Sequence, residues 1–221
     1  MGESGEILLM KNAERGLVSG RSGSGKSCFV KSTIKREKRV VVFDVLDEYS
    51  SIRGFRRASS LVELKKILRY SWSSGFKVAF VPKSGSEMAD LHALSVFILQ
   101  AQLPYKAGKD KREIILVVEE MNTCFPVTAL PAKYYGFGEI CSRGRHSGIN
   151  VLGVTQRVAE VNTRFRGNCN WTVFFAPNDH TDLKTICNVI SPKYRDTLSN
   201  LQTHYYLKYQ AGTITKGKNK L

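Results

Sequence analysis

The feature that most constrains this chain is a glycine-rich segment between a predicted strand and a predicted helix. Residues 20–27 read Gly-Arg-Ser-Gly-Ser-Gly-Lys-Ser and match the pattern G-x-x-x-x-G-K-[ST] at every fixed position. Residues 16–19 have strand character, and residues 27–36 have the pattern of a helix. Glycines let successive backbone N–H groups point inward, and the helix presents its positive end to the same point. The segment therefore predicts a phosphate-binding loop.

The side chains of this loop have distinct expected roles. Lys26 is expected to reach the β- and γ-phosphates of a nucleotide, and the Ser27 hydroxyl to be a ligand of Mg²⁺. ATP and Mg²⁺ are therefore the expected cofactors. The residues expected to bind the nucleotide are Gly20, Arg21, Ser22, Gly23, Ser24, Gly25, Lys26, Ser27 and Cys28.

Strand-like and helix-like segments alternate along the chain, which predicts an α/β fold with a mostly parallel central sheet flanked by helices. No composition shift marks a boundary, so we expect one domain over residues 1–221 with its core at about 16–190. A C-terminal hairpin and basic tail are expected within 200–221, and residues 216–221 are expected to fray. Further strands are expected at 39–44, 77–81, 114–119, 151–155 and 172–176, and further helices at 60–70, 88–102 and 182–189.

Acidic and amide side chains follow two of these strands. Glu119 and Glu120 come directly after five aliphatic residues, and a buried strand of this kind delivers them to the carboxyl edge of the sheet. We expect Glu119 to hold the metal ion and Glu120 to polarise the attacking water. Gln156, after strand 151–155, is expected to sense phosphate or to orient water. The paired carboxylates favour hydrolysis over phosphoryl transfer to a second substrate.

The charge balance points to a polyanionic partner. The 34 Lys and Arg residues exceed the 19 Asp and Glu residues, so the formal net charge is +15 and nucleic acid is favoured. The loop at 105–112 is the preferred DNA contact. The five scattered cysteines favour reduced intracellular thiols, and the four scattered histidines argue against zinc. We expect neither a signal peptide nor a transmembrane segment.

Taken together, three further stretches resemble the FtsK–HerA superfamily of P-loop translocases over roughly residues 16–190. Residues 43–49, Phe-Asp-Val-Leu-Asp-Glu-Tyr, look like the D-x-x-G-E-Y segment of that family, with Asp47 where glycine is usual. The Glu119-Glu120 pair matches its Asp-Glu pair except in the first acid. Residues 143–157, which read RGRHSGINVLGVTQR, are close to its G-R-H-x-G…T-Q-R segment.

The resemblance implies a RecA-like P-loop NTPase core with strand order 5-1-4-3-2. It also implies an oligomer, in the form of a hexameric ring, that pumps double-stranded DNA with ATP. A chain of this size is similar to the genome-packaging ATPases of tailless dsDNA bacteriophages with an internal membrane. Capsid or portal-vertex proteins are then expected partners, and the host cytoplasm or the virion the expected location. An arginine from the neighbouring subunit is expected to complete the site, and the candidates in order are Arg145, Arg143 and then Arg164 or Arg166.

Other functions remain open from the sequence. A HerA-like cellular translocase and a Zot-like phage-assembly ATPase share the class but normally carry accessory or membrane segments. A P-loop nucleotide kinase would leave the Glu119-Glu120 pair and the 143–157 stretch without a role. A capsid-vertex protein that binds ATP without turnover is a third class.

Overall fold

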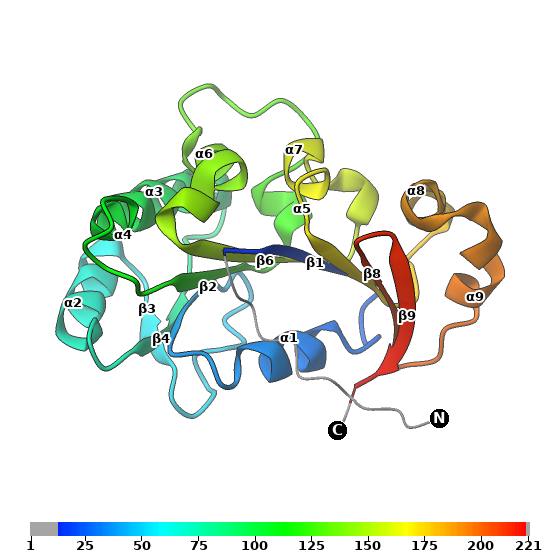
Figure 1. Ribbon diagram of the computed structural model, residues 1–221, viewed down its shortest axis with the longest axis horizontal. Helices are drawn as coiled ribbons and strands as arrows, with labels where there is room; N and C mark the ends of the chain where they lie inside the picture. Colours follow the sequence, from blue (N-terminus) through cyan, green and yellow to red (C-terminus); the bar gives the residue numbers. More distant parts are fainter. Residues whose placement is uncertain (1–12, 220–221) are drawn as a thin grey trace.

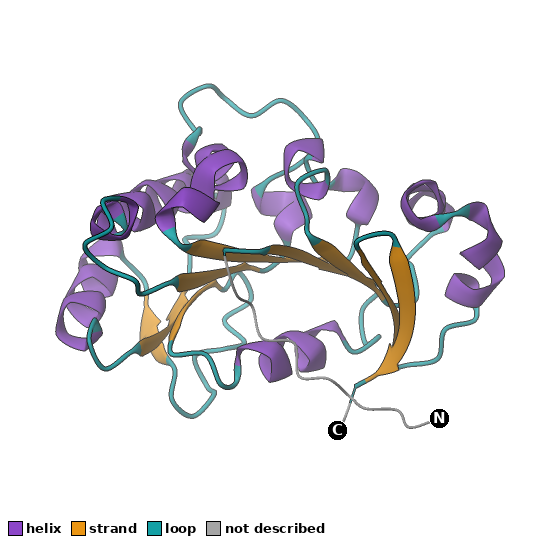
Figure 2. Cartoon of the chain, in the orientation of Figure 1, coloured by secondary structure: helices purple, strands orange, loops and turns teal. Residues whose placement is uncertain are grey.

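The computed structural model describes residues 13–219, and within them nine strands form a single sheet in the order β3-β4-β2-β5-β6-β1-β7-β8-β9. Helices lie on both faces of this sheet (Figures 1 and 2). The strands are β1 Arg15–Ser19, β2 Arg39–Phe43, β3 Arg56–Ala58, β4 Phe76–Phe80, β5 Ile114–Val118, β6 Ile149–Thr155, β7 Trp171–Phe174, β8 Tyr205–Gln210 and β9 Thr213–Lys218. The α-helices are α1 Lys26–Ile34, α2 Leu61–Ser71, α3 Glu87–Ala101, α4 Leu103–Lys106, α5 Met121–Cys124, α6 Gly136–Arg143, α7 Thr163–Arg166, α8 His180–Ile190 and α9 Arg195–Ser199. Short 3₁₀ turns are η1 Gly144–Ser147, η2 Val158–Glu160 and η3 Pro192–Tyr194.

The middle of the sheet confirms the strand order expected from the resemblance. The parallel strands β7-β1-β6-β5-β2 correspond to 5-1-4-3-2 when these five are counted along the chain. Strands β4 and β3 extend the sheet in parallel beyond β2. The expected C-terminal hairpin, β8 and β9, is present and extends the other edge antiparallel to β7.

The central strands are buried on both faces, which explains their continuous aliphatic composition. In β5, Ile114, Leu116 and Val118 pack in the cluster on the side of α3 and α6. The alternate residues, Ile115 and Val117, pack in the cluster on the side of α1. Figure 1 shows these helices on opposite faces. Because successive strand residues point to opposite faces, one five-residue strand joins both cores and fixes its own carboxyl end.

Two local expectations need correction. The expected fraying of residues 216–221 is wrong for the described part, since β9 runs to Lys218 and Asn219 is only 7% exposed; residues 220–221 lie outside the described residues. The expected loop at 105–112 begins in the last residues of α4. Between residues 13 and 219 no helix combines the length and hydropathy that a membrane crossing requires.

Candidate active site

The groups expected from the sequence meet at the carboxyl edge of the parallel strands. The glycine-rich loop follows β1, Glu119 follows β5 and Gln156 follows β6. These strands are neighbours in the sheet, so their ends are adjacent. A cavity of about 330 Å³ opens there, and its lining is Ser22, Gly23, Gly25, Lys26, Ser27, Cys28, Asp44, Leu46, Glu48, Glu119, Glu120, Gln156 and His204.

The loop has the backbone that its glycines allow. Gly23 and Gly25 have φ angles of 69° and 111°, in the left-handed region that side-chain-bearing residues rarely adopt. The Arg21 N–H donates to the Ala176 carbonyl at 2.8 Å, which ties the loop to the segment after β7. Helix α1 starts at Lys26, directly after the loop. The arrangement presents backbone N–H groups and a helix N-terminus to one anion, as expected for a phosphate site.

Lys26 is the buried cation of the site. Its amine donates to the Arg21 carbonyl at 3.0 Å, and its side chain is largely shielded from solvent. Desolvation by burial lowers the pKa of Lys26, while the negative charges of Glu120 and Glu119 raise it. No ion pair joins Lys26 to either glutamate among the ion pairs of residues 13–219. The ammonium group therefore remains available to a phosphate.

Glu119 is held by a tyrosine from a distant segment. The Tyr49 hydroxyl donates to Glu119 Oε1 at 2.5 Å. Burial raises the pKa of Glu119 to about 7, and the Tyr49 hydrogen bond opposes that rise. Tyr49 is itself placed by Asp44, whose carboxylate accepts the Tyr49 N–H at 2.8 Å. The D-x-x-x-E-Y segment thus orients the carboxylate that the sequence assigned to the metal.

Glu120 and Gln156 are in direct contact. The Gln156 Nε2 amide donates to Glu120 Oε1 at 3.0 Å. Glu120 has a φ of 46°, an uncommon angle for a residue with a side chain that is often found at functional sites. Glu120 lines the cavity together with residues of the glycine-rich loop. A hydrogen bond therefore joins Glu120, which the sequence assigned to water activation, to Gln156, which it assigned to phosphate sensing or water orientation.

The oxygen ligands present fit a magnesium ion. The Ser27 hydroxyl and the Glu119 carboxylate both line the cavity, and hard oxygen donors are the ligands that Mg²⁺ prefers. Residues 13–219 contain no group of three or more His, Cys, Asp or Glu side chains that could hold a metal ion alone. Mg²⁺ typically takes one or two protein ligands and completes its shell with phosphate and water, which matches this set.

The structure gives a physical account of the residue at position 47. Asp47 has a φ of 55°, in the region where glycine is most at ease and aspartate is tolerated. Its carboxylate accepts a hydrogen bond from Arg57 Nε at 2.9 Å. The positive φ explains why glycine is usual at this position of the segment, and the ion pair with Arg57 neutralises the negative charge that Asp47 brings.

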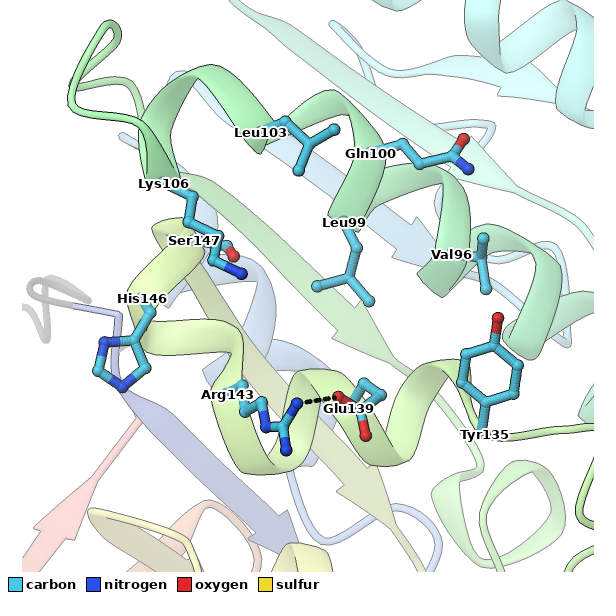
Figure 3. A pocket seen from close by; sticks show the side chains of 10 residues that line it. All are labelled: Val96, Leu99, Gln100, Leu103, Lys106, Tyr135, Glu139, Arg143, His146 and Ser147. Atoms are coloured by element: carbon cyan, nitrogen blue, oxygen red, sulfur yellow. Dashed lines mark ion pairs between the residues drawn. The ribbon is translucent and has the colours of Figure 1, made fainter.

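The candidate arginines Arg143 and Arg145 do not reach the site of their own chain. Both precede β6, whereas Gln156 follows it, and the seven residues of β6 span about 20 Å. Both are exposed, and Arg143 pairs with Glu139 at 3.4 Å. Arg143 borders a separate cavity of about 380 Å³ between α3, α4, α6 and η1 (Figure 3). Arg166 bonds the Val161 carbonyl through Nε, whereas Arg164 is exposed.

Two residues near the cavity carry roles that the sequence reasoning did not assign. Arg157, next to Gln156, bonds Asp179 at 2.8 Å and Asp182 at 3.1 Å. This pairing fixes the segment after β6 on α8. His204, from the turn before β8, lines the cavity itself. Arg157 belongs to the T-Q-R segment, so that motif could have identified it from the sequence. No sequence motif includes His204.

Comparisons with known proteins place the fold. No family model matches the chain, and no curated protein matches it. The genome packaging NTPase B204 from Sulfolobus turreted icosahedral virus 2, in complex with AMPPCP, is similar with a TM-score of 0.72 and 20% identity, covering 96% of this chain and 100% of that one. The DNA-packaging ATPase B204 from Sulfolobus Turreted Icosahedral Virus has the same values. VirB4 of Thermoanaerobacter pseudethanolicus has a TM-score of 0.64 and 11% identity, covering 94% of this chain and 89% of that one.

These similarities extend over nearly the whole chain. At identities of 20% and below, these structural similarities are evidence for a shared fold. The resemblance drawn from the sequence is thus confirmed at the level of the fold, and the chain has the RecA-like P-loop NTPase fold of these viral packaging proteins.

Proposed function

We propose that this chain is an ATPase that translocates double-stranded DNA and packages a viral genome into a preformed capsid. The observation that carries the proposal is the single cavity in which Lys26 and the glycine-rich loop face Glu119, Glu120 and Gln156. The similarity in fold to viral genome-packaging NTPases, one of them in complex with AMPPCP, supports both the nucleotide and the task.

The geometry supports hydrolysis of ATP. Loop N–H groups and Lys26 bind the phosphates, while Ser27 and Glu119 are the ligands for Mg²⁺. When bound, Mg²⁺ neutralises charge that develops on the phosphates. Glu120 accepts a hydrogen bond from the attacking water and orients it toward the terminal phosphate. The Gln156 amide holds the Glu120 carboxylate in place through its 3.0 Å hydrogen bond.

The basic loop at residues 105–112 supports contact with a DNA backbone. It precedes β5, so it lies at the opposite edge of the sheet from the nucleotide cavity. Asp110 neutralises Arg112 through a 2.7 Å ion pair, and the exposed lysines carry the net charge. Those lysines are Lys106, Lys109 and Lys111. Contacts of this kind bind phosphates without reading sequence, which suits a translocase.

The position of Arg145 and Arg143 supports an oligomer. A strand length separates them from their own cavity, so either arginine would act on the nucleotide of a neighbouring subunit. A hexameric ring around DNA, docked on capsid or portal-vertex proteins, is the assembly we propose. The protein would then work in the host cytoplasm and at the packaging vertex of the virion.

The proposal is tested by measuring ATP turnover with and without long double-stranded DNA at several protein concentrations. We expect turnover that DNA stimulates, that rises steeply with protein concentration and that Glu120→Gln reduces by about 100-fold or more. Asp196→Asn, at an exposed residue of α9, is the control and should keep wild-type turnover. Turnover that ignores DNA and requires a nucleotide or nucleoside acceptor would contradict the translocase and favour a kinase.

A further inference from the structure

The glycine-rich loop is fastened to the C-terminal hairpin by hydrogen bonds. The His204 N–H donates to the Ser24 carbonyl at 2.9 Å. The Asn219 side-chain amide donates to the Gly25 carbonyl at 2.7 Å, between residues 194 positions apart. The Asn219 N–H in turn donates to the His204 carbonyl at 2.9 Å. Both ends of the β8–β9 hairpin are therefore held on the loop that binds phosphate.

His204 has an uncommon backbone conformation. Its φ of 71° lies in the left-handed region, which costs about 1 kcal/mol or more for a residue with a side chain. Such a conformation persists where the surroundings determine it, and here the two backbone hydrogen bonds of His204 do so. The backbone that carries the imidazole is consequently held beside the cavity that His204 lines.

The imidazole has an unused polar atom beside the loop. His204 Nδ1 is buried and has no hydrogen-bond partner within the described part of the chain. A Cβ added to Gly25 would lie 2.9 Å from this atom, so the ring packs directly against the loop at that glycine. A buried polar atom without a partner costs about 1–3 kcal/mol. The ring therefore has a favourable place for an oxygen supplied by a ligand.

We propose that His204 is a further nucleotide-contacting residue, whose Nδ1–H donates to an oxygen of the α- or β-phosphate. The inference rests on the proposed nucleotide site. The backbone of a glycine-rich loop cradles the α- and β-phosphates, whereas the lysine reaches outward to the γ-phosphate. His204 touches the backbone of Ser24 and Gly25, and so it lies at the inner phosphates. Asn219 is a positioning residue, since it holds the turn that carries the imidazole.

The test compares two variants that both tolerate the positive φ. His204→Gly removes the ring, and His204→Asn keeps a short hydrogen-bond donor. Affinity for ADP and for AMPPCP is measured by isothermal titration calorimetry with Mg²⁺. We expect His204→Gly to weaken both ligands by the same factor, about tenfold, and His204→Asn to weaken them less. His180→Ala, at an exposed histidine of α8, should bind as wild type does.

A second measurement does not depend on any variant folding well. In the wild-type protein, the imidazole resonances of His204 should shift when ADP is added, and those of His180 should not. Unchanged affinity in His204→Gly, together with an unmoved His204 resonance, would overturn the inference. So would a loss confined to AMPPCP, because that places the contact at the γ-phosphate. If wild type binds no nucleotide at all, the proposed function itself fails; if Lys26→Ala alone loses binding, only the role of His204 fails.

Discussion

The Tyr49 hydroxyl donates a 2.5 Å hydrogen bond to Glu119 Oε1 across 70 positions of sequence. This contact joins the turn after β2 to the end of β5, the two strands that lie next to each other in the sheet. Burial raises the pKa of Glu119 to about 7, and the hydrogen bond is the largest effect acting against that rise. The charge state of the proposed metal ligand at neutral pH therefore depends on its burial and on the opposing hydrogen bond from Tyr49.

Tyr49→Phe removes the hydroxyl and keeps the ring in the core. Loss of the hydrogen bond raises the pKa of Glu119 further, so less of it is ionised at pH 7. We expect the acid limb of the pH profile of kcat/KM to move to higher pH, with a loss of roughly 3- to 10-fold at pH 7. The profile of Tyr194→Phe, in η3, should not move. An unmoved profile for Tyr49→Phe would show that another group sets the acid limb.

Glu119→Gln should stabilise the nucleotide-free protein above neutral pH. The folded-state pKa of about 7 lies above the usual 4.5, so the folded protein binds more protons between these values and loses stability as pH rises through them. The full shift corresponds to at most about 3 kcal/mol, a ceiling that residual solvent access lowers. Urea denaturation without Mg²⁺ should therefore give Glu119→Gln a higher free energy of unfolding than the wild type at pH 8. At pH 5 the two proteins should differ very little. Glu139→Gln, which breaks the exposed ion pair with Arg143, should leave the free energy of unfolding nearly unchanged at both pH values.

Arg157→Ala should destabilise the fold. Arg157 bonds Asp182, whose side chain is 1% exposed, so its loss leaves a buried carboxylate without its cation. We expect a decrease of about 2–4 kcal/mol in the free energy of unfolding, measured with urea. Arg143→Ala removes an ion pair whose arginine is 77% exposed and should cost less than about 0.5 kcal/mol. Equal effects for the two variants would contradict a structural role for Arg157.

Local sequence patterns were sufficient to predict the parts of this site that follow buried strands. The aliphatic run 114–118 has the composition of a doubly buried strand, and its end places Glu119 and Glu120 at the edge of the sheet. The glycine-rich loop is equally local, because its glycine spacing encodes the backbone that the structure shows. The loop and the carboxylates predicted the cavity because the carboxyl ends of neighbouring parallel strands lie side by side.

The remaining features depend on contacts that no local pattern encodes. Strand β3 has three residues with two exposed arginines, too short and too polar to be recognised. Helix α6 contains Gly136 and Gly138, which weaken its helical pattern. The tail resembles a solvated basic end, yet Asn219 is bonded to a loop 194 positions away. His204 enters the cavity for the same reason, through the path of the hairpin.

A mixing experiment tests whether Arg145 acts on the neighbouring subunit. Arg145→Ala and Glu120→Gln should each lose most of the ATP turnover. In a ring of both variants, a Glu120→Gln subunit can supply Arg145 to the intact cavity of an Arg145→Ala subunit. With random assembly about one interface in four is complete, so turnover should recover to roughly a quarter of the wild-type value.

The control for this recovery is a mixture of Glu120→Gln with Lys26→Ala. Both changes lie in one cavity, so each subunit has a defective site whatever its neighbour supplies, and no recovery is expected. Recovery in the first mixture but not in the second requires a residue that crosses the interface. If Arg145→Ala instead retains wild-type turnover without DNA and loses only the stimulation by DNA, Arg145 binds the DNA backbone. Its exposed position, a full strand length from its own cavity, is then explained by contact with DNA.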